Sequence, residues 1–150
     1  MPLAGETILA SDILDRRGVQ LERIANQAVT TGGAVKPISW DTEGEDTDTY
    51  WASGTPTVVT IPPGLSGIYL ITFRAAGLAS VRAMLEIVAT TASVPVPVDW
   101  RMPIDVTEDR AGITVCTPLD AGDTFVCNVF HNTGADVQYT AWMSCYRVSF

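Results

Sequence analysis

The chain has 150 residues, 47% of them hydrophobic, and a formal net charge of −8. This length suits one domain with a sizeable core, and no apolar run approaches the roughly 20 residues of a membrane-spanning helix. Because an acidic surface repels phosphate, the charge argues against nucleic-acid binding. The first ten residues contain Glu6 and no charged-then-apolar leader, so we expect a protein made in the cytoplasm, with no membrane insertion.

Residues 1–35 differ from the rest of the chain because they contain no aromatic residue and few large apolar side chains. Ser11 is a suitable cap for a short helix over 12–17, and a second helical stretch is expected over 19–29. Such a segment cannot form its own core, so we predict an arm that becomes ordered by docking on another protein. The alternative is a frayed leader without a role.

Residues 57–73 predict two strands joined by a Pro-Pro-Gly turn. β-branched residues, which favour strands, lie on both sides of the turn, and the two prolines have no amide hydrogen to donate to a neighbouring strand. In the second strand the side chains that share one face are expected to be largely buried: Tyr69, Ile71 and Phe73. The opposite face, with Ile68, Leu70 and Thr72, is also mostly apolar. This pattern favours a central strand of a β-sandwich.

The remaining sequence shows period-two alternation in several short runs separated by turn residues. These runs lie near residues 80–90, 94–98, 113–117, 124–130 and 137–150. The prolines of 94–98 indicate an edge strand or an extended connection. With no convincing helix after residue 35, the pattern predicts an all-β domain over residues 36–150, either a sandwich or a jelly roll.

An acidic loop is expected over 41–48, where five of eight residues carry carboxylates. Their spacing does not match an EF-hand, so we predict a solvated loop and no metal, although a bound cation stays an open alternative. The three cysteines, Cys116, Cys127 and Cys145, are predicted to be small buried hydrophobes whose oxidation state the sequence leaves open. His131 is the only histidine, which argues against zinc.

No catalytic motif is present. His131 has no serine or cysteine partner in a motif, and the pair Glu108-Asp109 is expected to be a solvated turn, so the sequence predicts neither an enzyme nor a cofactor. A monomeric carbohydrate-binding module that uses Trp51 or Trp100 as a stacking platform is an alternative function.

Three landmarks in order resemble the trimeric jelly rolls of tumour necrosis factor and of the complement subcomponent one-q heads. They are the Gly67-Ile68-Tyr69 entry to a strand after Pro and Gly, the LDAGDTF turn at 119–125, and a terminal aromatic strand over 142–150. The resemblance implies a homotrimer, and apolar second faces on two strands agree with an assembled protein. The candidate residues for its interface are Tyr69, Phe73, Tyr139 and Trp142.

The opening GETILASD at residues 5–12 resembles the start of bacteriophage tail and other virion proteins. This resemblance implies a non-enzymatic structural protein of a virion, such as a minor tail protein that touches a host-surface glycan or protein. A capsid decoration or head-fibre protein is the alternative, and tail and capsid positions are not distinguished. Other virion proteins would hold the arm over 1–35 through Ile8, Leu9, Ile13, Leu14, Arg16 and Arg17.

Overall fold

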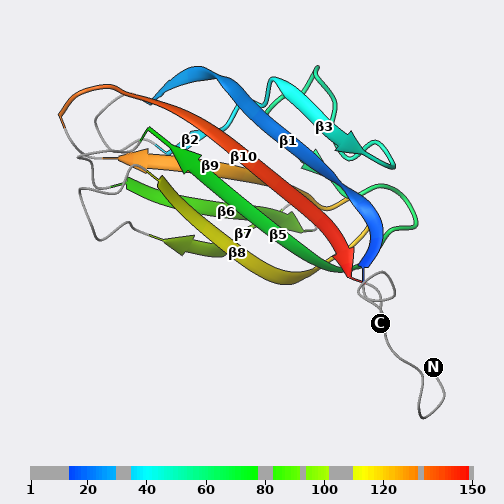
Figure 1. Cartoon of the computed structure of the whole chain (residues 1–150). Coiled ribbons are helices and arrows are strands. Elements are labelled where there is room, and N and C mark those ends of the chain that lie inside the picture. Colours follow the sequence, from blue (N-terminus) through cyan, green and yellow to red (C-terminus); the bar gives the residue numbers. More distant parts are fainter. Residues whose placement is uncertain are drawn as a thin grey trace, which may run out of the picture.

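The computed structural model describes residues 14–29, 35–77, 83–91, 94–101, 110–131 and 134–148, with side chains omitted for 14–16 and 94–101. Every regular element in these ranges is a β-strand, and the strands form two antiparallel sheets (Figure 1). None of the described segments forms a helix that could cross a membrane. The all-β prediction is therefore confirmed.

Sheet A has the strand order β3-β1-β10-β5-β8, and sheet B has the order β2-β9-β6-β7, with β4 also paired to β9. The strands of sheet A are β3 (Thr42–Asp46), β1 (Leu14–Val29), β10 (Val137–Val148), β5 (Gly67–Ala76) and β8 (Arg110–Leu119). Those of sheet B are β2 (Lys36–Pro37), β9 (Thr124–His131), β6 (Ala83–Thr91), β7 (Val94–Arg101) and β4 (Val59–Thr60). In Figure 1 sheet A lies in front of β9 and β6.

The first described strand corrects the expectation of helices in the N-terminal segment. Leu14–Val29 forms β1, which lies between β10 and β3 and pairs with both. Val19, Leu21 and Val29 are buried, so β1 contributes to the same core as the rest of the sheet. The expected domain boundary at residue 35 therefore falls after a strand of the sandwich, because pairing and burial override local helix propensity.

The expected acidic loop over 41–48 is also corrected, because Thr42–Asp46 forms β3 at the edge of sheet A. Glu43 and Glu45 are exposed on this strand. Charged side chains on an edge strand discourage pairing with another chain. The acidic composition is thus compatible with a strand at this position.

The expected central strand is confirmed as β5, an inner strand of sheet A between β10 and β8. Tyr69, Ile71 and Phe73 are all 0% exposed and point between the sheets. The alternation expected near 80–90 is confirmed as well, since the odd-numbered residues of β6 from Ala83 to Ala89 are buried. The proline-containing strand β7 lies at an edge, as predicted.

Two predicted turns contact each other beside β4. The Ile61 amide donates to the Asp123 carbonyl at 2.8 Å, and the Gly122 amide donates to the Ile61 carbonyl at 2.9 Å. Gly122 has a φ of 90°, and Gly64 in the Pro-Pro-Gly turn has a φ of 79°, conformations that favour glycine. These bonds join the segment that follows β4 to the turn between β8 and β9.

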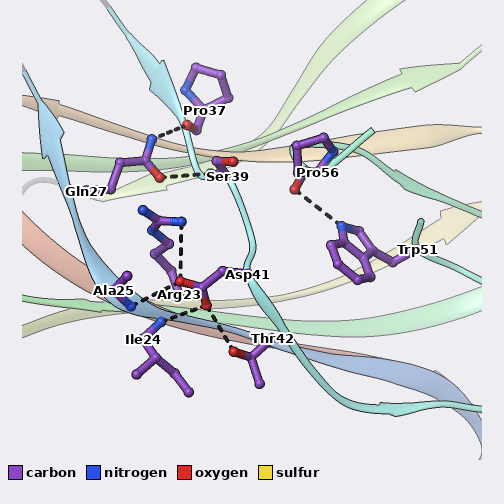
Figure 2. A network of polar contacts seen from close by, with 10 residues as sticks. All are labelled: Arg23, Ile24, Ala25, Gln27, Pro37, Ser39, Asp41, Thr42, Trp51 and Pro56. Carbon is purple, nitrogen blue, oxygen red and sulfur yellow. Dashed lines mark hydrogen bonds and ion pairs between the residues drawn. The ribbon is translucent and has the colours of Figure 1, made fainter. Parts of the chain in front are cut away.

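Residues 38–41 cross from β2 in sheet B to β3 in sheet A, and side chains of β1 hold this crossing in place (Figure 2). The Gln27 side chain donates to the Pro37 carbonyl at 3.0 Å and accepts from the Ser39 amide at 2.9 Å. Gln27 thus bonds the crossing backbone as a neighbouring strand would. The crossing keeps its backbone partners although it belongs to neither sheet.

Asp41 anchors the other end of the crossing to an irregularity in β1, where the register with β10 shifts between Arg23 and Gln27. Its carboxylate accepts from the Ile24 and Ala25 amides, each at 3.0 Å, and lies 3.2 Å from Arg23 Nη1 (Figure 2). Burial raises the pKa of Asp41, but these hydrogen bonds and the Arg23 charge outweigh it and lower the pKa overall. The charged carboxylate therefore stabilises the bulge.

Candidate interaction surface

The outer face of sheet A carries a group of neighbouring apolar side chains on three of its five strands, β10, β5 and β8. Leu70, which is 37% exposed, lies between Tyr146 of β10 and Cys116 of β8. One row away, Ile68 lies between Val148 and Pro118. We call these six residues the apolar patch: Ile68, Leu70, Cys116, Pro118, Tyr146 and Val148. A contiguous apolar group on a surface is typical of an interaction site.

The same face becomes polar farther along the strands. The hydroxyl groups of Thr72 and Thr114 are 3.2 Å apart across β5 and β8. In the next row the Arg74 guanidinium lies 5.7 Å from the ring centroid of Trp142, a cation–π contact. The apolar patch is therefore confined to the part of the face near Leu70, and it borders groups that can form hydrogen bonds.

Tyr146 is held in place at one side of the apolar patch. Its hydroxyl donates to Glu45 of β3 at 2.9 Å and accepts from the Gln20 side chain at 2.6 Å. Burial raises the pKa of Tyr146, and the Glu45 carboxylate adds to this effect. Its ring lies against Gly18, where an added Cβ would come within 2.6 Å of a ring carbon. An added Cβ would also clash with the Cys145 carbonyl oxygen, so glycine here allows both β10 and the Tyr146 ring to approach β1 closely.

Three of the four residues expected at a trimer interface lie inside the sandwich. Tyr69 and Phe73 are 0% exposed and Tyr139 is 1% exposed, so their side chains form the core of a single chain. The physical reason is parity, because all three occupy inward positions of their strands. Trp142 occupies the opposite parity and lies on the outer face, partly buried beside Arg74.

The residues expected to anchor the arm are only partly described. Ile8, Leu9 and Ile13 lie outside the described residues. Leu14 and Arg16 belong to the backbone of β1, and Leu14 pairs with Val148. Arg17 is exposed at the same end of the strand. The described part of the expected arm is thus a strand adjacent to the apolar patch.

The acidic residues near β3 serve as internal acceptors. Besides Asp41, the Asp46 carboxylate accepts from the amides of Tyr50 and Trp51, both at 2.9 Å. Within the described ranges no group of three metal-ligating side chains is close enough to hold an ion. Two of the five carboxylates are therefore occupied by backbone amides.

Of the three cysteines and the histidine, one side chain is exposed and three are buried. Cys116 is exposed in the apolar patch, which corrects the expectation that all three cysteines are buried. Cys127 and Cys145 are buried, and burial raises the pKa of both thiols. His131 is 1% exposed, and its Nε2 lies 2.7 Å from the Val29 carbonyl oxygen. His131 thus contacts the end of β1.

The aromatic residues considered for carbohydrate stacking do not form an exposed platform in the described part of the chain. Trp51 is half-buried against the core, and its indole nitrogen donates to the Pro56 carbonyl at 3.3 Å (Figure 2). The Trp100 side chain and the pair Glu108-Asp109 lie outside what the structure describes. The outer face of sheet A, which holds Trp142 and the second apolar face expected at Ile68 and Leu70, is the better candidate surface.

Comparisons with known proteins identify the fold. No family model matches the sequence, and no curated protein matches it either. Among solved structures, the globular domain of zebrafish complement 1qA is similar, with a TM-score of 0.66 and 15% identity over 89% of this chain and 98% of that one. The vertex protein P5 of phage PRD1 has a TM-score of 0.63 and 12% identity over 88% and 96%. Eiger TNF from S. frugiperda has a TM-score of 0.57 and 13% identity over 89% and 94%.

Each of these three likenesses covers 88% or 89% of this chain. The chain therefore has the jelly-roll fold shared by tumour necrosis factor and complement one-q domains, as the three sequence landmarks implied. Identities this low establish the fold alone.

Proposed function

We propose that the chain is a non-enzymatic structural protein of a phage particle and that it assembles as a homotrimer through the outer face of sheet A. The observation that carries the proposal is the apolar patch around Leu70. Soluble monomers rarely leave such a group of side chains in water. Association of identical copies around a closed axis removes the same surface from water on every subunit.

The likeness to a vertex protein supports a place in a virion, together with the resemblance of residues 5–12 to virion protein openings. In this arrangement the jelly roll projects from the particle, and the segment before β1 attaches it. A trimer brings three such segments together, so weak individual contacts act jointly through their effective concentration. Attachment at a tail or at a capsid vertex satisfies this argument equally.

Light scattering on the purified chain tests the assembly. We expect a trimeric mass at micromolar concentration and a monomeric mass for Leu70→Arg, because a charge in the apolar patch cannot be paired inside the interface. Ile24→Arg is the matched control, since Ile24 is 61% exposed on β1 but lies outside the patch. It should keep the trimeric mass.

Cys116 offers an independent measurement. Among the three cysteines it alone is exposed in a single chain, and it lies in the apolar patch. Maleimide labelling should therefore be slow in the assembled protein and fast in Leu70→Arg. A monomeric native chain with rapid labelling would reject the homotrimer and favour a single binding module.

The virion role has its own test, which does not depend on the oligomeric state. Gold-labelled antibody against the chain should mark purified particles at a fixed position, at the tail or at the vertices. Absence of the chain from purified particles would reject the role while leaving the trimer intact.

A further inference from the structure

Among the residues that the structure describes, three buried side-chain polar atoms have no hydrogen-bond partner: Arg23 Nε, Trp40 Nε1 and Tyr139 OH. Trp40 is 2% exposed and Tyr139 is 1% exposed. A buried polar group without a partner costs free energy, on the order of 1–3 kcal/mol. Three of them in one small domain call for an explanation.

The strand register places Arg23 and Tyr139 on the same face of sheet A, in adjacent rows. On the inner face of sheet A, Arg23 of β1 pairs with Ala141 of β10, which pairs with Ala75 of β5. Tyr139 precedes Ala141 by two residues in β10 and therefore lies on the same face. The row with Ala141 and Ala75 therefore lies between Tyr139 and the row that contains Phe73. Because alanine side chains are small, larger neighbouring side chains can extend over this row.

Trp40 reaches this corner of the core from the crossing segment. Its ring meets the Phe73 ring edge-on, with centroids 6.3 Å apart. The next residue, Asp41, forms the ion pair with Arg23 that holds the guanidinium at this corner. Burial raises the pKa of Tyr139, and the Arg23 charge acts on it in the opposite direction, which agrees with a guanidinium near the hydroxyl.

The chemistry of the three atoms limits what can join them. The Nε–H of arginine and the Nε1–H of tryptophan only donate, whereas a tyrosine hydroxyl can donate or accept. The shared partner must therefore accept at least two hydrogen bonds. Asp41 already balances the Arg23 charge, so an added anion would remain an uncompensated charge in the core of a chain that carries a net charge of −8.

We propose that this corner is an internal hydration site, in which a water molecule accepts from Arg23 Nε and Trp40 Nε1 and exchanges a hydrogen bond with the Tyr139 hydroxyl. Three polar contacts match the usual coordination of buried water. The water connects β1, the crossing segment and β10 where the β1 register shifts, and so it adds to the attachment that Asp41 and Gln27 provide. This inference is independent of the proposed function.

A crystal structure at better than about 2 Å tests the site directly. Solvent density should lie within about 2.7–3.2 Å of all three atoms. Ordered side chains with no density among them would overturn the proposal.

Unfolding in urea at a fixed protein concentration tests it in solution. Tyr139→Phe should lower the folding equilibrium constant about fivefold, as the loss of a satisfied hydrogen bond does. Tyr69→Phe is the matched control, because Tyr69 is equally buried and its hydroxyl donates to the Leu65 carbonyl at 2.5 Å. This variant loses a hydrogen bond that is present within the protein, so its folding equilibrium constant should fall by a similar factor. A Tyr139→Phe protein as stable as the native chain, or more stable, would mean that the hydroxyl has no partner and would refute the water.

A halide titration separates water from an anion. At constant ionic strength, replacing gluconate by bromide should leave the melting temperature unchanged. A rise with bromide that disappears in Tyr139→Phe would assign the corner to an anion instead and would overturn the hydration site.

Discussion

Truncation of Phe73 to alanine tests the assignment of β5 as an inner strand with one face wholly committed to the core. Phe73 is 0% exposed and lies between Met143 and Ile113 on the neighbouring strands, with Trp40 edge-on to its ring. Phe73→Ala removes the buried ring and leaves a cavity that close neighbours fill only in part. Such truncations cost about 3–5 kcal/mol, of which an edge-to-face pair accounts for roughly 0.5–1.5 kcal/mol.

Against a total stability of about 5–15 kcal/mol, this loss is large. With a urea dependence of about 2 kcal/mol per molar, the midpoint of unfolding should fall by roughly 2 M. Tryptophan fluorescence is a suitable signal because Trp40 borders the cavity. Native and variant chains must be compared at one concentration, since any self-association would stabilise the folded state.

Ile24→Ala is the control, because it removes an apolar side chain of similar kind that is 61% exposed. Its effect should stay within about 0.5 kcal/mol, as is usual at surface positions. A loss below about 1 kcal/mol for Phe73→Ala, or equal losses for the two variants, would refute the packing described for the inner face of sheet A.

Two further predictions concern β1. Because the Asp41 pKa is lowered in the folded chain, its carboxylate contributes stability above the unfolded pKa of about 3.9, and this contribution disappears as the pH falls through the folded pKa. The stability gap between the native chain and Asp41→Asn should thus be largest near neutral pH and shrink below about pH 4; a constant gap from pH 6 to pH 3 would contradict the anchoring of the bulge. Deletion of residues 1–35 removes β1 and should abolish folding by circular dichroism, whereas deletion of 1–13 retains every described strand and should leave a folded chain. A folded 36–150 fragment would support the domain boundary expected from the sequence at residue 35.

The strands of the central region could be predicted because their side chains alternate without interruption. In β5 and β6 every second residue is buried, and no irregularity changes the phase within the sequence run used for the prediction. The turns at Gly64 and Gly122 were recognisable for a similar local reason, since glycine is favoured where φ is positive.

β1 could not be predicted in the same way. Its pairing with β10 shifts twice, between Leu14 and Gly18 and between Arg23 and Gln27, so period two holds only over short stretches. One usable signal was present in residues 19–22, where apolar and polar side chains alternate. The apolar spacing of Leu21, Ile24 and Ala28 imitates a helix, but Ile24 is exposed at the bulge.

The candidate surface was missed for a different reason. The aromatic residues of β5 and β10 were the basis of the interface prediction. The face that each side chain occupies depends on whether its position in the strand is odd or even, and Tyr139 and Trp142 lie on opposite faces. The sequence places Leu70 on the second apolar face of its strand, but its neighbours Cys116 and Pro118 belong to β8, which is distant in the chain. A patch formed by three strands becomes visible only when their register is known.

The fixed position of Tyr146 strengthens the case for the apolar patch as an interface. Hydrogen bonds with Gln20 and Glu45 hold its hydroxyl near β3, and its ring lies against Gly18 of β1. Leu70 lies on an inner strand, whose backbone is paired on both sides. Ordering side chains on association costs roughly 0.5–1.5 kcal/mol for each one immobilised, so a surface already held in one conformation loses less. A second copy would therefore contact a patch whose largest side chain, Tyr146, is already held in one conformation. Less of the free energy gained by burying Leu70 and its neighbours would then be lost to the ordering of side chains.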